Sequence, residues 1–210
     1  MDAMMERLTT TEAAVAAGVS VPQINRIIDE KILPEDLYST SPTRTFRTHA
    51  ALLIAFYFET ADSLTTGARL EAIRSAEMRC STWNEWKNCT VGDHYLTIRF
   101  SDLWKEVDGR LRRLSEARAM VVEDPEILSG TPVIRGTRIP VYDVAAQVEA
   151  GVPPEEIFEM YPRLNAAQVE LASIYATAVP QRGRPRRPSI PGATLISVTK
   201  KRLRSSSQGA

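Results

Sequence analysis

Three polar side chains that could read DNA follow one another in a short amphipathic stretch. Gln23, Asn25 and Arg26 are of the types that hydrogen-bond base edges in the major groove, and the apolar residues around them would keep them on an outer face. Further along the chain, Arg44 and Arg47 lie on either side of a phenylalanine and could bind backbone phosphates. These five residues are the predicted DNA-binding surface.

The alternative for this region is a helical hairpin that forms a core and binds nothing. Through Thr48 the chain has five basic and seven acidic residues, a balance that works against a polyanionic partner. A recognition helix with an arginine-bearing wing needs only a few cations, and a second subunit would double them across a palindromic site. We favour DNA binding and keep the alternative open.

A helix, a tight turn and a second helix would position the first three side chains. Residues 9–33 begin with threonine caps, place alanines on a short helix, break at Gly18 and restart after Ser20 with Pro22 in the first turn. Apolar residues then recur at three and four positions, which predicts one buried face on the second helix: Val21, Ile24, Ile27 and Ile28.

A small hairpin and a buried helix are predicted next. The sequence "YSTSPTRTFRT" has turn residues around Arg44, Phe46 and Arg47, and "HAALLIAFYFETA" is typical of a buried helix. With A-x-x-A-G-V-S at 14–20 and R-x-F at 44–46, residues 9–58 resemble the winged helix-turn-helix of MerR-like regulators. That resemblance implies binding to double-stranded DNA through the second helix and the wing.

The middle of the chain, residues 61–119, is predicted to be a connector. Residues 64–79 have a helical pattern, residues 93–100 alternate like a strand, and residues 101–120 form a capped amphipathic helix. We expect the apolar side of that last helix to face inward and its arginines to face water. The inward residues are Trp104, Val107, Leu111 and Leu114, and the arginines are Arg110, Arg112 and Arg113.

A glycine- and proline-rich stretch, "EDPEILSGTPVIRGTRIPV" at 123–141, raises the question of a phosphate loop. Gly130 and Gly136 enclose five residues, no lysine follows, and Pro132 lacks a backbone donor, so the Walker pattern fails. A hairpin fits better, with strands at 131–134 and 138–141 joined through Arg135, Gly136 and Thr137. Three helices with short turns are predicted to follow it.

Residues 121–178 are similar to a small VapB-type antitoxin domain family, the domain-of-unknown-function family 433. The resemblance implies an antitoxin that is paired with a PIN-like ribonuclease toxin and that binds DNA to repress its own operon. The match includes "YPRLNAAQVELASIYA" and these signature positions: Asp124, Pro125, Ile127, Gly130, Pro132, Ile134, Gly136, Thr137, Arg138, Ile139, Val141, Gly151, Glu155, Glu156 and Ile157.

The charge of residues 120–178 argues against the DNA binding that the family resemblance implies for this domain. Residues 120–178 contain three basic and nine acidic residues, so phosphates should repel this domain. Its last helix, residues 165–178, has no lysine or arginine, and we expect it to pack against another subunit of a homodimer. Arg135 and Arg138 either bind a partner or bond local carboxylates such as Asp124, Glu126 or Asp143, and the sequence does not separate these possibilities.

The tail, residues 180–210, concentrates positive charge. Of the 26 lysines and arginines, eight lie here without one acid, which leaves 18 against 26 acidic residues upstream. Its composition predicts disorder until it is bound. "RGRP" at 182–185 resembles the core of an AT-hook, a minor-groove motif, but we favour toxin binding through carboxylates. The cations are Arg182, Arg184, Arg186, Arg187, Lys200, Lys201, Arg202 and Arg204.

Other classes of protein are disfavoured. There is no constellation of catalytic residues, and two cysteines with two histidines make a zinc site improbable, so we expect neither an enzyme nor a metal or cofactor. The longest apolar run, residues 50–58, is about half of the ~20 residues that a membrane span needs, and the first residues lack a signal-peptide core, so a cytoplasmic protein is expected.

Together these patterns predict a mainly α protein with two small helix-turn-helix-type domains, short β-hairpins and a disordered basic tail. Its expected function is that of a type II antitoxin that inhibits a PIN-like ribonuclease and represses its own operon. The alternative is a free-standing MerR-like transcriptional regulator whose C-terminal domain binds a ligand or a protein. The domain boundaries are 1–60, 61–119, 120–179 and 180–210.

Overall fold

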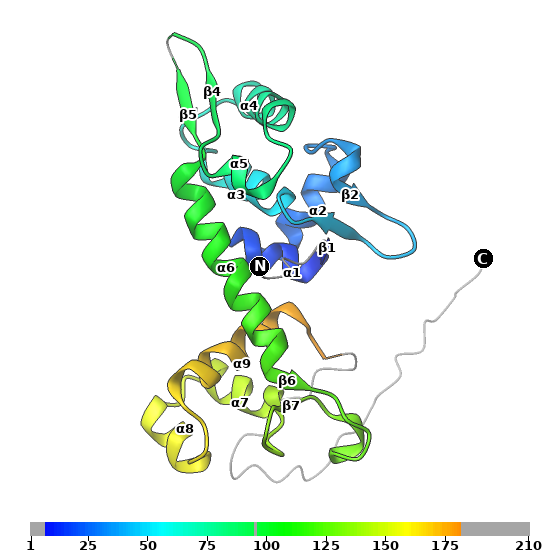
Figure 1. Ribbon diagram of the computed structural model, residues 1–210, viewed down its shortest axis with the longest axis vertical. Helices are drawn as coiled ribbons and strands as arrows, with labels where there is room; N and C mark the ends of the chain where they lie inside the picture. The colour runs from blue at the N-terminus through cyan, green and yellow to red at the C-terminus, as the bar shows by residue number, and fades with distance from the viewer. Residues whose placement is uncertain (1–6, 95, 182–210) are drawn as a thin grey trace, which may run out of the picture.

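The computed structural model describes residues 7–94 and 96–181, which form two lobes along one long helix, α6 (Ser101–Met120) (Figure 1). The N-terminal lobe (residues 7–100) packs on the first half of α6, and the C-terminal lobe (residues 121–179) surrounds its end. The expectation of a mainly helical protein with short β-strands is confirmed. No helix in the described ranges combines the length and apolarity that crossing a bilayer requires.

Two capped helices open the N-terminal lobe: α1 (Thr10–Ala17) and α2 (Val21–Asp29). Thr9 and Ser20 each form a capping box, which satisfies backbone donors that a helix start would otherwise leave unpaired. Gly18 ends α1 with φ +71°, a left-handed conformation that glycine adopts without strain. The predicted helix, turn and helix are confirmed, with Ile24 and Ile27 fully buried and Ile28 half-buried, but Val21, which was predicted to be buried, is exposed.

A three-stranded antiparallel sheet lies beside these helices. β3 (Thr45–Arg47) is its central strand, with β1 (Arg7–Thr9) on one side and β2 (Tyr38–Ser39) on the other. The β2–β3 hairpin, residues 38–47, is called the wing here. A 3-10 turn, η1 (Glu35–Leu37), leads into it. The sequence predicted the wing but not β1, which is too short to show alternation.

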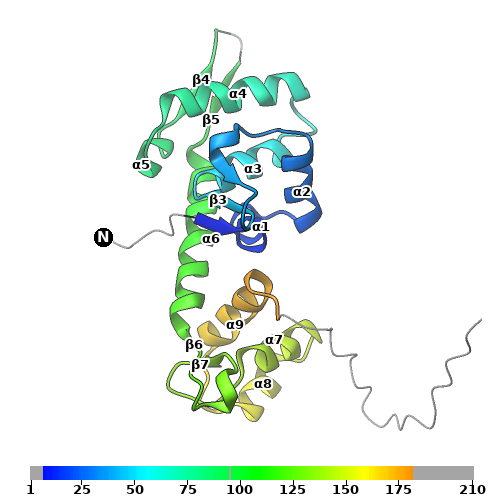
Figure 2. The same ribbon diagram turned by 90° about the vertical axis from the view of Figure 1, so that its right-hand side faces the viewer.

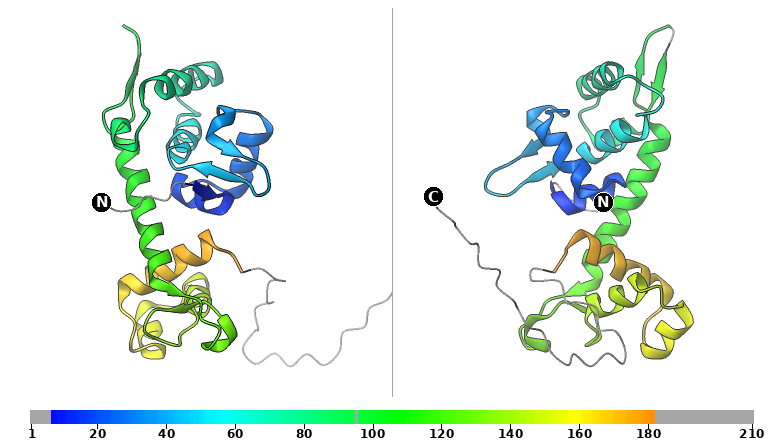
Figure 3. Two further views of the ribbon diagram at one scale, coloured as in Figure 1. Left: turned by 45° about the vertical axis from the view of Figure 1, so that its right-hand side comes forward. Right: turned by 180° about the vertical axis from the view of Figure 1, so that it is seen from behind.

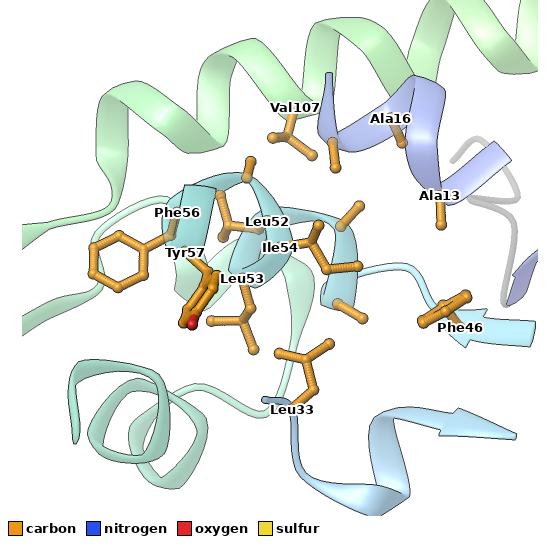
Figure 4. Packing of buried hydrophobic residues seen from close by; sticks show 14 of the residues in the cluster. Ala13, Ala16, Leu33, Phe46, Leu52, Leu53, Ile54, Phe56, Tyr57 and Val107 are labelled. Carbon is orange, nitrogen blue, oxygen red and sulfur yellow. The ribbon is translucent and has the colours of Figure 1, made fainter. Parts of the chain in front are cut away.

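The longest apolar run becomes α3 (Ala50–Glu59), whose residues 50–57 are all buried. Figure 4 shows Leu52, Leu53 and Ile54 of α3 packed between α1, α6 and the wing strand, with Phe46 at the edge of the cluster. The lobe is completed by α4 (Thr66–Arg79), α5 (Trp83–Trp86), β4 (Thr90–Gly92) and β5 (Thr97–Arg99). The strand predicted over 93–100 is therefore shorter and pairs with β4.

The C-terminal lobe has its own core around Ile134, Val141 and Ala172. One prediction for it was wrong: β7 (Val133–Ile134) pairs with β6 (Val121–Val122), and residues 138–141 form no second strand. An isolated bridge joins Val133 to Pro140, and the Ile134 N–H donates to the Ile139 carbonyl at 3.0 Å across the predicted turn, but the second arm stays too short for a strand because α7 begins at Val141. The other elements are η2 (Leu128–Gly130), α7 (Val141–Glu149), α8 (Pro154–Met160) and α9 (Ala166–Ala178).

α9 joins the two lobes. It packs against α7 and α6 and also reaches α1, and its last residue, Ala178, belongs to the core of the N-terminal lobe (Figure 2). Val169, Ala172 and Tyr175 of this helix are buried inside the chain, and its predicted packing against another subunit stays a prediction. An ion pair between Arg113 of α6 and Glu170 of α9 adds to the contact.

Candidate nucleic-acid interface

Arg7 and Arg47 face each other across the sheet as direct partners of β1 and β3. The next pair, Leu8 and Phe46, is completely buried, so the two arginines lie on the opposite, outer face, where both are exposed. Like charges placed directly opposite destabilise a sheet. An anion between the two guanidinium groups would remove that repulsion, which makes this pair a candidate phosphate site.

Arg7 was missed by the sequence analysis because three residues are too few to reveal a strand. Its Nη1 donates to Thr45 Oγ1 of the wing at 3.0 Å, which holds its side chain over the sheet. Within the described ranges, none of Arg7, Arg44 and Arg47 forms a salt bridge. Over the part of the chain that the structure describes, the sheet and its hairpin therefore carry three exposed arginines that have no salt bridge.

Arg44 connects the wing to α2. Its Nη1 donates to the side-chain Oδ1 of Asn25 at 2.9 Å, across 19 positions of sequence. The arginine is exposed and the asparagine is half-buried. The contact thus fixes one of the predicted base-reading side chains against one of the predicted phosphate-binding side chains, as a helix and wing on one duplex would require.

On α2, Arg26 is exposed and Gln23 is half-buried, and each side chain has a partner within the chain. The Gln23 Oε1 accepts from the Ser20 backbone at 2.8 Å, so this side chain also holds the start of α2. Arg26 donates to Glu30 at 2.8 Å on the exposed side of the helix, and this hydrogen bond and the Glu30 charge raise the pKa of the Arg26 guanidinium. Each side chain has further N–H groups that could donate to DNA, but each also has a partner within the chain.

Hydrogen bonds hold the tight turn at residues 135–137, within the signature sequence, in one conformation. Thr137 Oγ1 donates to the Ile134 carbonyl at 2.7 Å and accepts from the Ile139 N–H at 3.1 Å, while Gly136 has φ +76°. Arg135 Nε donates to the Ala119 carbonyl at 2.9 Å, near the end of α6. Gly130 also has a positive φ, of +81°.

The two arginines of that turn do not follow the local-carboxylate interpretation. Both Arg135 and Arg138 are exposed, and over residues 7–94 and 96–181 neither forms a salt bridge to Asp124, Glu126 or Asp143. Arg135 instead helps to complete the hydrogen bonding of a helix end. This contact of Arg135 is structural, and Arg138 is exposed.

A cavity of about 390 Å³ lies between α4, α5 and β4, away from the wing. The buried thiols of Cys80 and Cys89 line it, and burial together with the neighbouring Cys80 thiol raises the pKa of Cys89 to about 12. A thiol that holds its proton so firmly is a poor nucleophile. In the part of the chain that the structure describes, no three His, Cys, Asp or Glu side chains come together as a metal site.

The eight tail cations that were predicted to bind a toxin lie outside the described residues: Arg182, Arg184, Arg186, Arg187, Lys200, Lys201, Arg202 and Arg204.

Comparison with known proteins finds a family match for the C-terminal lobe. Residues 121–176 match the family described as "Protein of unknown function (DUF433)", which begins at β6 and ends within α9. The whole chain is similar to "Uncharacterized protein y4eO" of Sinorhizobium fredii, with 47% identity over 193 residues, 89% of this chain and 87% of that protein. The chain therefore belongs to the same family as y4eO. No solved structure matches it.

Proposed function

We propose that this protein is a DNA-binding regulator of the autorepressing antitoxin kind, acting as a homodimer in the cytoplasm. The observation that carries the DNA-binding part is the joining of α2 to the wing through Asn25 and Arg44. Beside that pair, Arg7 and Arg47 face each other on the outer surface of the sheet. In this proposal the base-edge contacts come from α2 and the phosphate contacts from the sheet of the same lobe.

Each group has a defined role in this proposal. Arg7 and Arg47 bind phosphates, which fixes the register of the protein on the duplex. Asn25 reads a base edge through its amide, most naturally adenine, and Arg44 orients that amide. The module has more acids than cations, but Arg44 and Arg47 lie on the wing and Arg7 lies on the strand that pairs with it. A dimer doubles the set over two half-sites.

The antitoxin part rests on the C-terminal lobe and on its family resemblance. Nine acidic and three basic residues over positions 120–178 make this lobe a poor partner for nucleic acid. A protein partner suits it better, and the resemblance to VapB-type antitoxins suggests a PIN-like ribonuclease toxin. In this proposal the N-terminal lobe binds the operator while the C-terminal lobe and part of the tail engage the toxin.

Selection of bound duplexes from a random pool, followed by affinity measurements, tests DNA binding. Arg47→Ala should weaken binding roughly tenfold, since the variant cannot form a charge-assisted hydrogen bond to a phosphate. Arg74→Ala is the matched control, because Arg74 is also exposed but lies on α4, where it pairs with Glu71. Failure to enrich any duplex, or equal effects of both variants, would reject this interface.

Co-expression with the adjacent reading frame tests the antitoxin part. Rescue of growth and co-purification of the two chains would support inhibition of a toxin. If the neighbour is harmless and never co-purifies while DNA binding persists, the protein is a free-standing MerR-like regulator whose C-terminal lobe has another partner.

A further inference from the structure

Val21 is exposed, although the spacing of apolar residues predicted a buried side chain. It is the first residue of α2, directly after the capping residue Ser20, and 37% of its surface is exposed. Ile24 and Ile27, in contrast, are fully buried and attach the helix to the core of the lobe. Single exposed apolar side chains are common on protein surfaces, so the position of Val21 on α2, more than its exposure, indicates a role.

Val21 lies one helical turn before Asn25. Residues four positions apart are neighbours on one face of a helix. Asn25 is also the residue through which α2 contacts the wing, since Arg44 donates to its side chain at 2.9 Å. Figure 3 shows α2 and the wing together on the side of the N-terminal lobe that faces away from α6. A duplex that lies against Asn25 would therefore also reach Val21.

The start of α2 is the end of the helix that suits the interior of a groove. Residues 20–22 are all exposed, and residues 13–25 contain no charged side chain. At the other end of the helix Asp29 is exposed, and phosphates would repel its carboxylate. Recognition helices place their N-terminal residues against the base edges. The charges on α2 thus favour an orientation in which Val21 enters the groove.

We infer that Val21 is a specificity-determining residue that contacts the methyl group of a thymine. In the major groove this methyl group distinguishes thymine from the other bases, and apolar side chains recognise it. The inference rests on the proposed DNA-binding function and adds a second base to the one that Asn25 reads. Four helical residues advance about 6 Å, and successive base pairs are about 3.4 Å apart, so the thymine should lie within about two base pairs of that base.

Removing the methyl group from the DNA tests the contact without changing the protein. Each thymine of the selected duplex is replaced in turn by deoxyuridine, whose base lacks only the methyl group, and the affinity of the full-length protein is measured. Asn25→Ala locates the base that Asn25 reads, as the position at which this variant loses discrimination. At one thymine close to that position, the wild type should bind the deoxyuridine duplex about fourfold more weakly, as expected for the loss of one buried methyl group.

Val21→Ala shows whether Val21 is the partner of that methyl group. In this variant the same replacement should change the affinity by less than about twofold, because the contact has already been removed from the protein side. Val148→Ala is the matched control, since Val148 is also 37% exposed but lies on α7 in the C-terminal lobe. The control should keep the full wild-type penalty for deoxyuridine.

An equal deoxyuridine penalty in the wild type and Val21→Ala would overturn the inference. So would the absence of any thymine near the Asn25 position at which deoxyuridine weakens binding. If Val21→Ala changed the oligomeric state in sedimentation experiments and kept the penalty, Val21 would belong to a protein contact and the inference would be wrong. Failure of the proposed function looks different, because the wild type itself would then enrich no duplex.

Discussion

The carboxylate of Glu12 in α1 is ion-paired with the guanidinium of Arg118 in α6, and Glu12 is 1% exposed. The same carboxylate accepts from the backbone N–H of Thr9 at 2.8 Å, which completes the capping box of α1. One buried acid thus starts the helix-turn-helix and ties it to the helix that connects the lobes. Burial lowers the pKa of Arg118, as expected for a cation partly removed from water.

Arg118→Met should therefore lower the free energy of unfolding by about 2 kcal/mol. Removing one partner of a buried pair leaves an uncompensated charge, a change that costs several kcal/mol when burial is complete and less here because Arg118 is 40% exposed. Lys105→Met is the control, since its pair with Asp102 is on the surface and should contribute little to stability. Urea unfolding measures both.

A third variant separates the ion pair from simple packing. Glu12→Gln combined with Arg118→Met removes both charges and should recover part of the stability that Arg118→Met alone removes. Additive losses would show that the two side chains act independently.

Glycine positions provide a second prediction. At Gly92 φ is +128°, and an added Cβ would lie 1.9 Å from the Leu96 carbonyl oxygen inside the β4–β5 turn. Gly92→Ala should therefore destabilise the protein by more than about 2 kcal/mol, because backbone must move. Gly67→Ala should be neutral or stabilising by up to about 1 kcal/mol, since Gly67 is in α4 with open space around it. Thermal unfolding of the two variants checks the contrast.

Much of the helical architecture was predictable because its causes are local. Thr9, Ser20 and Asn165 each start a helix with a side chain three residues before its partner, so caps and apolar spacing were visible together. The strands were harder, since two or three residues cannot display alternation. The β6–β7 pairing in particular joins residues on both sides of a loop, and a neighbouring tight turn suggested a different hairpin.

The sequence indicated which residue types could form the candidate site but not which of those residues contact one another. The sequence identified Asn25 and Arg44 separately, and only folding shows that they touch. Arg7 escaped notice because its role depends on pairing with a strand 40 positions away, as the register with Arg47 shows. Gln23 and Arg26 were predicted to be solvated, whereas a cap and an adjacent carboxylate engage them. Whether a polar side chain bonds to a neighbouring group or to water depends on the folded positions of the two groups, which the sequence does not give.

The Asn25–Arg44 contact predicts that substitutions at these residues impair base discrimination, whereas a substitution at Arg47 impairs affinity for all sequences. Asn25→Ala should reduce discrimination at one base position by about 1 to 3 kcal/mol. Arg44→Ala should reduce discrimination at the same position, because it removes the group that orients Asn25, and should also lower the salt slope if it touches a phosphate. Arg47→Ala should weaken binding to all sequences alike. Affinities for single-base variants of the selected duplex measure all three.

If Arg44→Ala weakened binding uniformly, as Arg47→Ala is expected to do, Arg44 would be only a phosphate contact. The orienting role would then be wrong even though the interface itself would stand.

The last prediction concerns alkaline pH and the buried pair of thiols. Burial first, and then the neighbouring Cys80 thiol, raise the pKa of Cys89 from an ordinary value of 9.0 to about 12, and burial likewise raises that of Tyr175 to about 12. Both groups are neutral when protonated, so the unfolded chain releases these protons at lower pH than the folded chain does. The stability they contribute is complete below pH 9 and is lost as pH rises through 12.

Between pH 9 and 11 the free energy of unfolding should fall by about 1 to 2 kcal/mol more in the wild type than in Cys89→Ala. Tyr175→Phe should remove only the part of the decrease that begins near pH 10, which separates the two groups. Urea unfolding at pH 9, 10 and 11 provides the measurement, and parallel pH profiles for the wild type and Cys89→Ala would show that Cys89 ionises in the folded protein as readily as in the unfolded one.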